Sequence, residues 1–85
     1  MTDQEVIEAV RQVFVESFEL PLERLTPEAA IFQDLGLDSL DLVDLVVALQ
    51  KRFGVLVRND ERIRNVRTLQ DLYDYLLTIR REQGL

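Results

Sequence analysis

The chain has 85 residues, nearly half of them apolar, a formal net charge of −6, and neither cysteine nor histidine. This length gives one small domain over residues 1–85. The composition excludes disulfides, a thiolate nucleophile, cysteine zinc sites and the usual general base at neutral pH, so we expect no catalytic residue, no metal ligand and no enzyme. The negative charge disfavours nucleic acid as a partner, because phosphates would be repelled.

The charge is unevenly distributed along the sequence. Residues 1–50 contain 11 carboxylates and only Arg11 and Arg24 as cations, whereas residues 51–85 contain 8 cations and 5 carboxylates. Residues 1–5 are acidic where a secretory signal would be basic, and no apolar run has the length of a membrane span. We therefore expect a cytoplasmic monomer that is polarised along its sequence and has no membrane partner.

A first helix is predicted over residues 3–17. Thr2 and Glu5 have the spacing of a capping box, in which each side chain accepts a hydrogen bond from the other residue's backbone N–H. The apolar residues that follow at helical spacing share one side of this helix: Val6, Ile7, Val10, Val13, Phe14 and Phe18.

Residues 18–38 have no helical period and contain two prolines, which indicates a long connection. Thr26, Pro27 and Glu28 are typical of a short helical turn. We expect Ile31, Phe32 and Leu35 to anchor the connection to the core, so that it is ordered. Leu20, Leu22 and Leu25 are expected to lie beneath it.

A second helix is predicted over residues 38–53, with Asp38 as N-cap, Ser39 as its first helical residue and Gly54 as its stop. Asp41 adds negative charge where the helix dipole favours it. At 100° per residue the apolar residues of this helix form two stripes, roughly 130° apart. The inward stripe is Leu42, Leu45, Val46, Leu49 and Phe53; the outward stripe is Leu40, Val43 and Val47.

Two more helices complete the predicted fold. A short one over residues 59–65 places Ile63 inward, and a longer one over residues 68–81 begins with a cap signal from Thr68 to Asp71. The inward residues of the longer helix are Leu69, Leu72, Tyr73, Leu76 and Ile79. We therefore predict an all-α fold: a small four-helix bundle of three longer helices and a short third one, with a long ordered loop between the first two.

Three interpretations of Ser39 compete on the residues alone. It can be a simple helix cap, which is the commonest role of serine at this position. A nucleophilic serine is disfavoured, because no histidine and no nearby lysine is available to activate it. It can also be a modification site, since a phosphate ester at a helix N-terminus meets free backbone N–H groups.

Residues 34–41, Asp-Leu-Gly-Leu-Asp-Ser-Leu-Asp, followed by an acidic and apolar helix, resemble the acyl carrier proteins. The resemblance extends over almost the whole chain and includes residues 26–28, Phe32, Ala48-Leu49 and Phe53-Gly54. It implies that Ser39 is esterified by 4′-phosphopantetheine, which a phosphopantetheinyl transferase donates from coenzyme A. The arm would carry acyl intermediates as thioesters to fatty-acid, polyketide or related biosynthetic enzymes.

The resemblance also gives the outward stripe a use. Leu40, Val43 and Val47, with the carboxylates of Asp38, Asp41 and Asp44 close by, would contact basic docking patches on acyl synthases and transferases. The alternative is burial of this stripe against another helix. The inward residues, in turn, can form a core that opens to shelter an acyl chain, or a core and nothing more: Val6, Val10, Phe14, Leu45, Val46, Leu49, Ile63, Leu72 and Leu76.

The basic residues after Gln50 depart from the familiar acidic fatty-acid carriers: Lys51, Arg52, Arg58, Arg62, Arg64 and Arg67. They indicate a solvated basic face, pairing with the acidic half, or a carrier whose partners differ from the general set. A peptidyl or aminoacyl carrier remains an alternative, although such carriers more often have glycine where Leu37 stands. An unmodified helical interaction domain, which would not need Ser39, is the alternative from another class.

Overall fold

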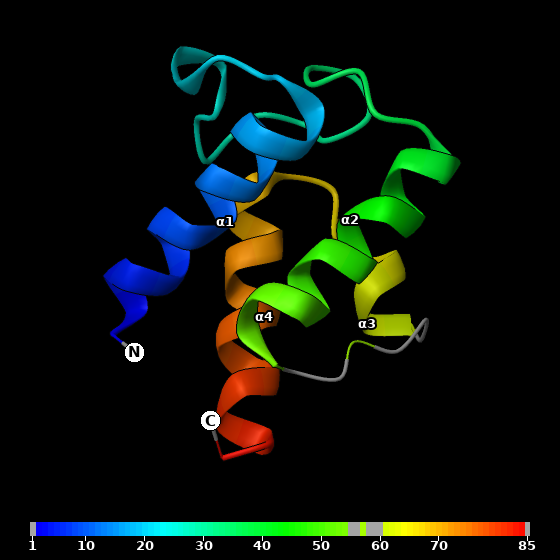
Figure 1. The fold of residues 1–85 in the computed structure, drawn as a ribbon. Coiled ribbons are helices and arrows are strands. Elements are labelled where there is room, and N and C mark those ends of the chain that lie inside the picture. The colour runs from blue at the N-terminus through cyan, green and yellow to red at the C-terminus, as the bar shows by residue number, and fades with distance from the viewer. Residues whose placement is uncertain (1, 55–56, 58–60, 85) are drawn as a thin grey trace.

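The computed structural model describes residues 2–54, 57 and 61–84, and these residues form helices joined by turns (Figure 1). The helices are α1 (Asp3–Phe18), α2 (Ser39–Phe53), α3 (Glu61–Arg64) and α4 (Leu69–Glu82), and a 3-10 turn, η1, spans Leu22–Arg24. The described residues contain no β-strand, only an isolated bridge between Ala30 and Thr68. The prediction of an all-helical fold is confirmed.

The three long helices differ from their expected ranges by one residue at one or both ends. Each begins with a capping box, at Thr2 and Glu5, Asp38 and Asp41, and Thr68 and Asp71. Residues 59 and 60 of the expected third helix lie outside the described part of the chain, and α3 is a single turn. No described helix has both the length and the apolar character needed to cross a membrane.

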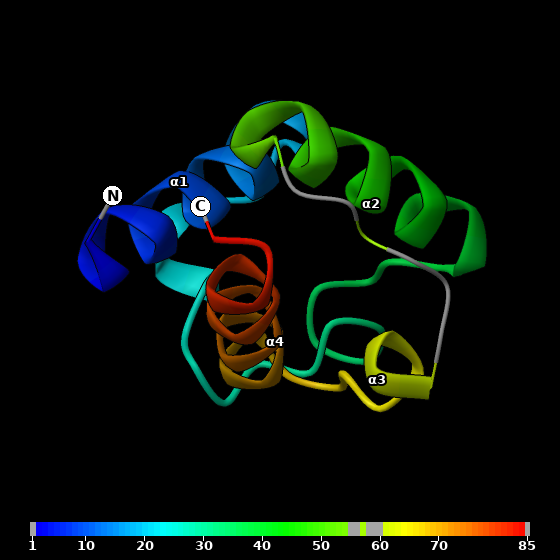
Figure 2. The ribbon, with the colours of Figure 1, turned by 90° about the horizontal axis from the view of Figure 1, so that it is seen from below.

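α1 packs against both α2 and α4, and α3 packs against α4. Figure 2 shows α1 and α2 together on one side of the molecule, with α4 and α3 on the other. The core between them includes side chains from every part of the described chain, the largest fully buried ones being Val6, Val10, Phe14, Ile31, Leu45, Leu49, Leu69, Leu72 and Ile79. Of the nine residues expected in the core, eight are buried, and Val46 is only half-buried.

The connection from α1 to α2 is ordered because it is hydrogen-bonded to the beginning of α4. The Ile31 N–H donates to the Arg67 carbonyl at 2.8 Å, and the N–H groups of Leu69 and Gln70 donate to the carbonyls of Ala29 and Pro27 at 3.1 and 3.0 Å. These bonds join segments that are about forty residues apart in the sequence. The position of α2 therefore depends on α4 through this connection.

Several details of this connection differ from expectation. Ile31, Leu35 and Leu25 are buried and Leu20 is half-buried, but Phe32 is 44% exposed and Leu22 is 54% exposed. Phe32 is not an anchor, because Ile31 and Leu35 already occupy the inward positions of this turn. The helical turn expected at residues 26–28 is replaced by a turn closed by the Ala29 N–H and the Thr26 carbonyl, and the 3-10 turn lies earlier, at η1.

The basic residues of the second half pair in two ways. Arg80 and Arg81 lie 3.6 and 3.7 Å from the Asp3 carboxylate, which links the two ends of the chain. Arg62 instead pairs at 2.8 Å with Glu82, in its own half, and its guanidinium lies 5.9 Å from the centroid of the Tyr75 ring. For Arg62 the expected pairing with the acidic half is therefore wrong; Arg58 and the side chain of Arg64 lie outside the described residues.

Candidate functional site

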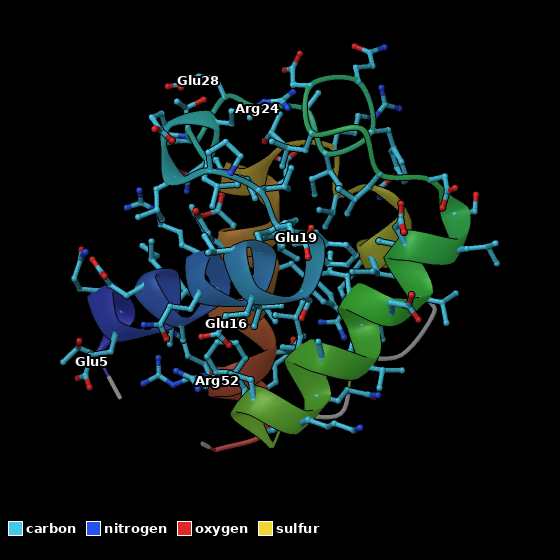
Figure 3. All side chains as sticks on the ribbon, turned by 45° about the horizontal axis from the view of Figure 1, so that its top comes forward. Glu5, Glu16, Glu19, Arg24, Glu28 and Arg52 are labelled. Atoms are coloured by element: carbon cyan, nitrogen blue, oxygen red, sulfur yellow. The ribbon has the colours of Figure 1, made fainter. Side chains whose placement is uncertain are left out.

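A fixed turn leads the chain into α2. Gly36 has φ of +74°, a backbone conformation that side chains disfavour, although no atom lies within 4 Å of the place a Cβ would occupy. The glycine is therefore needed for its backbone angle and not for space. Leu35 and Leu37 on either side are buried, and the Asp34 carboxylate accepts the Ala30 N–H at 2.8 Å. Arg24, which is labelled in Figure 3, also donates to the Asp34 carbonyl.

The capping box of α2 determines which groups around Ser39 are available. The Asp38 carboxylate accepts the Asp41 N–H at 2.9 Å, and the Asp41 carboxylate accepts the Asp38 N–H at 3.1 Å. The backbone N–H groups of Ser39 and Leu40 have no acceptor among the described residues. Two donors at the start of this helix therefore remain open to an anion, next to the Ser39 hydroxyl.

The Ser39 side chain is exposed and has no hydrogen-bond partner among the described residues. The N-cap role belongs to Asp38, so the interpretation of Ser39 as a helix cap is wrong. A serine nucleophile would need a base in contact with its hydroxyl, and no described side chain makes that contact. The described residues also contain no group of acidic side chains suited to a metal ion. Ser39 is thus an accessible hydroxyl that nothing in the described structure activates.

The outer face of α2 is apolar and exposed. Leu40 is 76% exposed, Val43 60% and Val47 42%. The alternative that this stripe is buried against another helix is therefore wrong. The carboxylate of Asp44, on the same face, is exposed and has no partner among the described residues, whereas those of Asp38 and Asp41 are held in the capping box.

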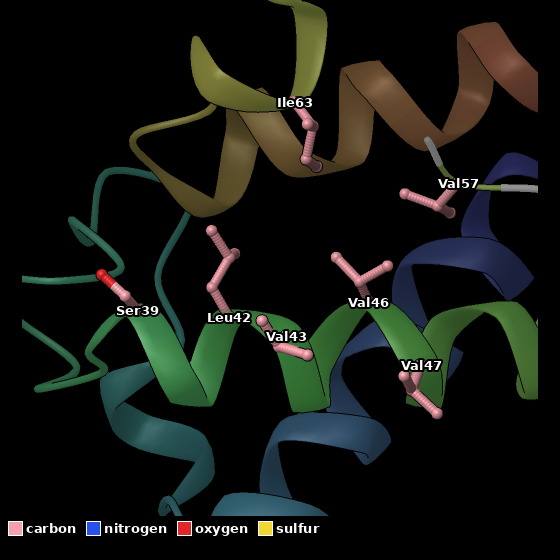
Figure 4. A pocket seen from close by; sticks show the side chains of 7 residues that line it. All are labelled: Ser39, Leu42, Val43, Val46, Val47, Val57 and Ile63. Carbon is pink, nitrogen blue, oxygen red and sulfur yellow. The ribbon is translucent and has the colours of Figure 1, made fainter. Parts of the chain in front are cut away.

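A cavity of about 430 Å³ begins beside Ser39 and extends between α2 and α3. In Figure 4, Leu42 and Val46 point from α2 toward Ile63, while Val47 points away from α3. Its described lining is apolar except for Ser39: Leu42, Val43, Val46, Val47, Val57 and Ile63. Val46 packs against the core and also lines this cavity, which leaves it half-buried.

The structure thus brings together at one end of α2 most of the residues that the sequence had singled out. Ser39, the two capping carboxylates and the outward stripe lie side by side, as their spacing on one helix requires. Val46 and Ile63, which were expected in a core that can open for an acyl chain, line this cavity, whereas Leu42 and Val57 were not expected to do so. No signal in the sequence could have shown it, because a cavity depends on how far α3 stands from α2.

The comparison with known protein families places residues 8–76 in the family described as "Phosphopantetheine attachment site". Among curated proteins, the chain is similar to "Acyl carrier protein 2" of Ralstonia nicotianae, with 42% identity over 72 residues, which cover 85% of this chain and 88% of that protein. It is 36% identical to the acyl carrier protein of Thermosynechococcus vestitus over 76 residues, covering 89% and 93% of the two chains. The acyl carrier protein of Syntrophobacter fumaroxidans is 50% identical over 54 residues, 64% of this chain and 65% of that protein.

Proposed function

The chain belongs to the acyl carrier protein family, and from this premise we propose that Ser39 is the residue to which 4′-phosphopantetheine is attached. Proteins of this family are carriers, so the chain holds acyl intermediates on phosphopantetheine and is not an enzyme. The observation that carries the assignment is the exposed Ser39 hydroxyl at the first helical position of α2, which has no hydrogen-bond partner among the described residues. When attached, the arm supplies the thiol that this sequence lacks.

The residues around Ser39 fit a phosphate ester. The N–H groups of Ser39 and Leu40 are unpaired in the described structure, and the N-terminal end of the helix dipole favours negative charge. The capping carboxylates of Asp38 and Asp41 are both negative, but each is turned toward a backbone N–H. We therefore propose that Asp38 and Asp41 keep the start of α2 in place while Ser39 is modified.

Acyl carrier proteins interact with a phosphopantetheinyl transferase and with biosynthetic enzymes. We propose that these enzymes bind the outer face of α2 through Leu40, Val43 and Val47, and that basic patches on them meet Asp38, Asp41 and Asp44. Carboxylates increase the rate of encounter, and the apolar side chains add affinity that salt does not screen. Transfer that is unchanged when the salt concentration is doubled would contradict the electrostatic part.

The cavity supports an acyl rather than an aminoacyl cargo. Among the described residues, its lining offers an acyl chain only apolar side chains beyond Ser39, and none of these lining residues carries a carboxylate that could pair with an amino group. We propose that the chain of the cargo enters between α2 and α3, close to Val46 and Ile63, rather than between α1 and α4. The names of the relatives, all acyl carrier proteins, agree with this choice.

The position of the cargo is testable by NMR. The methyl signals of Val46 and Ile63 should shift between a short and a long acyl load, because only the long chain reaches them. Val13 and Leu72, buried in α1 and α4 and not part of the cavity lining, are the matched controls and should keep their shifts. If all four residues respond equally or none responds, the cargo does not lie in this cavity.

We also propose that residues 1–85 form one domain of four helices, counting the single turn of α3, and that the protein is a cytoplasmic monomer. One core cluster receives side chains from all four helices, which supports a single domain. For the described residues, no second cluster separates from it. Sedimentation of the purified chain tests the monomer.

The attachment itself is tested by the intact mass of the protein after incubation with coenzyme A and a phosphopantetheinyl transferase. The wild type should gain one phosphopantetheine, and Ser39→Ala should gain none while keeping its helical circular dichroism spectrum. The only other serine in the sequence, Ser17, is exposed on α1 and provides the matched control. Ser17→Ala should be modified like the wild type; modification of Ser39→Ala would contradict the assignment.

A further inference from the structure

The exposed face of α2 continues past Val47 to a cation. At 100° per residue, Leu40, Asp44, Val47 and Lys51 lie within an arc of roughly 60° on the helix surface. All four are exposed, so they form one line along the outer face. The carboxylate of Asp44 lies nearer to Ser39 on this line, and the ammonium group of Lys51 lies nearer to the C-terminal end of α2.

Asp44 and Lys51 are the two charged side chains on this line. Neither side chain has a hydrogen bond or ion pair among the described residues. The neighbouring cation differs: the Arg52 guanidinium donates to the Gln12 side-chain oxygen at 2.9 Å, and Figure 3 shows Arg52 extending toward α1. Arg52 therefore helps to hold α2 to α1, whereas Lys51 has no partner in the described part of the chain.

The two free charges are too far apart on the helix to neutralise each other. They are seven positions apart, which is two helical turns or about 10 Å along the helix axis. A surface that covers this face must therefore meet a negative group and a positive group at different places. Lys51 lies about 18 Å along the helix axis from Ser39. It would therefore contact a part of the partner far from the attachment point.

We infer that the enzymes that bind this carrier have a docking groove with charges of both signs, basic beside Asp44 and acidic beside Lys51. This inference rests on the proposed docking of α2 and adds the chemistry of the partner. Opposite charges at two separate points on α2 favour one direction of the helix in the groove, since the reversed direction would bring like charges together. In the favoured direction of α2, Ser39 always lies at the same end of the groove.

A second copy of the chain would be the other complementary surface. In an antiparallel pair of α2 helices, Asp44 of each copy would face Lys51 of the other, because such a pair has two-fold symmetry. The apolar part of the face is limited to Leu40, Val43 and Val47, whereas a stable interface needs roughly 20–30 residues from each partner. The size of this face therefore favours an enzyme groove, which can add contacts beyond α2.

Charge reversal of the acyl-loaded carrier tests the inference, with a synthase from the same host as the enzyme and the apparent kcat/KM for acyl transfer as the readout. Asp44→Lys and Lys51→Glu should each lower kcat/KM by about tenfold at low salt, and the loss should shrink as salt is added. The double variant exchanges the two charges and leaves the net charge unchanged. It should be no better than either single variant, because the order of charges along α2 is then reversed.

Arg67→Glu is the matched control for Lys51→Glu. Arg67 is exposed in the connection between α3 and α4, and reversing it changes the net charge equally; kcat/KM should stay within about twofold. Equal or faster transfer by Lys51→Glu would overturn the inference, as would a double variant that regains wild-type activity or a stable dimer that depends on Lys51. A wild-type chain that gains no arm would contradict the proposed function itself, which the intact mass shows independently.

Discussion

α2 and α4 have nearly the same length, 15 and 14 residues, and each begins with a capping box closed by an aspartate. Their burial is very different. α4 buries six side chains, whereas α2, although it contains more apolar residues, buries only Leu45 and Leu49. The difference shows that apolar content alone does not distinguish a core helix from a helix that presents a surface; the fraction of that content left exposed does.

The N-terminal N–H groups of α4 are also better satisfied than those of α2. In α4 the first four N–H groups all have acceptors: Thr68 and Asp71 pair with each other, and Leu69 and Gln70 donate to carbonyls of the connection from α1. In α2 the N–H groups of Ser39 and Leu40 have none within the described structure. The N–H groups at the start of α4 are thus all paired, which suits this helix to a supporting role, whereas the two N–H groups without an acceptor at the start of α2 suit that helix to modification.

Truncating one leucine in each helix should give the largest contrast. Leu72 of α4 is fully buried and Leu40 of α2 is 76% exposed. Leu72→Ala should lower the free energy of unfolding by about 2–5 kcal/mol, because it leaves a cavity in the core. Leu40→Ala should change it by less than about 0.5 kcal/mol and instead reduce acyl transfer. Urea unfolding and a transfer assay on both variants check this; similar stabilities would contradict the division of roles.

Removing the cap residue of each helix should give a smaller difference. Thr68→Ala should cost about 1 kcal/mol of stability, since the Asp71 N–H is half-buried and loses its acceptor. Asp38→Ala should cost less, because water can reach the exposed start of α2, but it should slow the modification of Ser39. Urea unfolding midpoints and the rate of phosphopantetheine addition separate the two. Equal loss of stability, with unchanged modification, would argue against the comparison.

Acid should weaken the closed start of α4 through Asp71. Hydrogen bonds from the backbone N–H groups of Arg67 and Thr68 lower the pKa of the Asp71 carboxyl. Because the pKa is lower in the folded state, this contribution is fully present above the pKa of the unfolded state and is lost as the pH falls below that value and through the lower pKa of the folded state. Asp71→Asn should lose less stability than the wild type between pH 5 and pH 3 (roughly the range of a carboxyl titration).

Asp74→Asn is the control for that measurement. Asp74 is an exposed carboxylate on the same helix, and its recorded side-chain partner is the Gln70 amide rather than a backbone N–H. Thermal unfolding of the three proteins across the acid range gives the comparison. A wild type and an Asp71→Asn variant with identical acid dependence would show that the carboxylate of Asp71 does not stabilise α4.

The helices and their ends could be predicted from the sequence because the signals for them are local. Thr2 with Glu5, Thr68 with Asp71, and Gly54 in the left-handed conformation each act within a few residues. The stripes of α2 are local as well, since they follow from the helical period alone. The same reasoning identified Ser39 as the first helical residue, so the candidate site was accessible from sequence.

Features that depend on distant segments could not be predicted. Tyr75 was not expected in the core, and it is buried partly because Arg62, thirteen positions earlier, lies over its ring. Phe32 was expected inside and is exposed, since the pairing of Ile31 with Arg67 sets which side of that turn faces inward. The cavity beside Ser39 is another such feature, because it is the space left between α2 and α3.

The bonds from the connection to α4 have a mechanical consequence. Two residues before Ser39, the Leu37 N–H donates to the Ile31 carbonyl, and the Ile31 N–H donates to the Arg67 carbonyl beside the start of α4. These two bonds connect the attachment point to α4. A force on Ser39 therefore reaches α4, which buries six side chains, through two backbone hydrogen bonds and is not taken up by extension of the loop. These hydrogen bonds therefore restrict how far Ser39 can move away from the start of α4 when an enzyme pulls on the cargo.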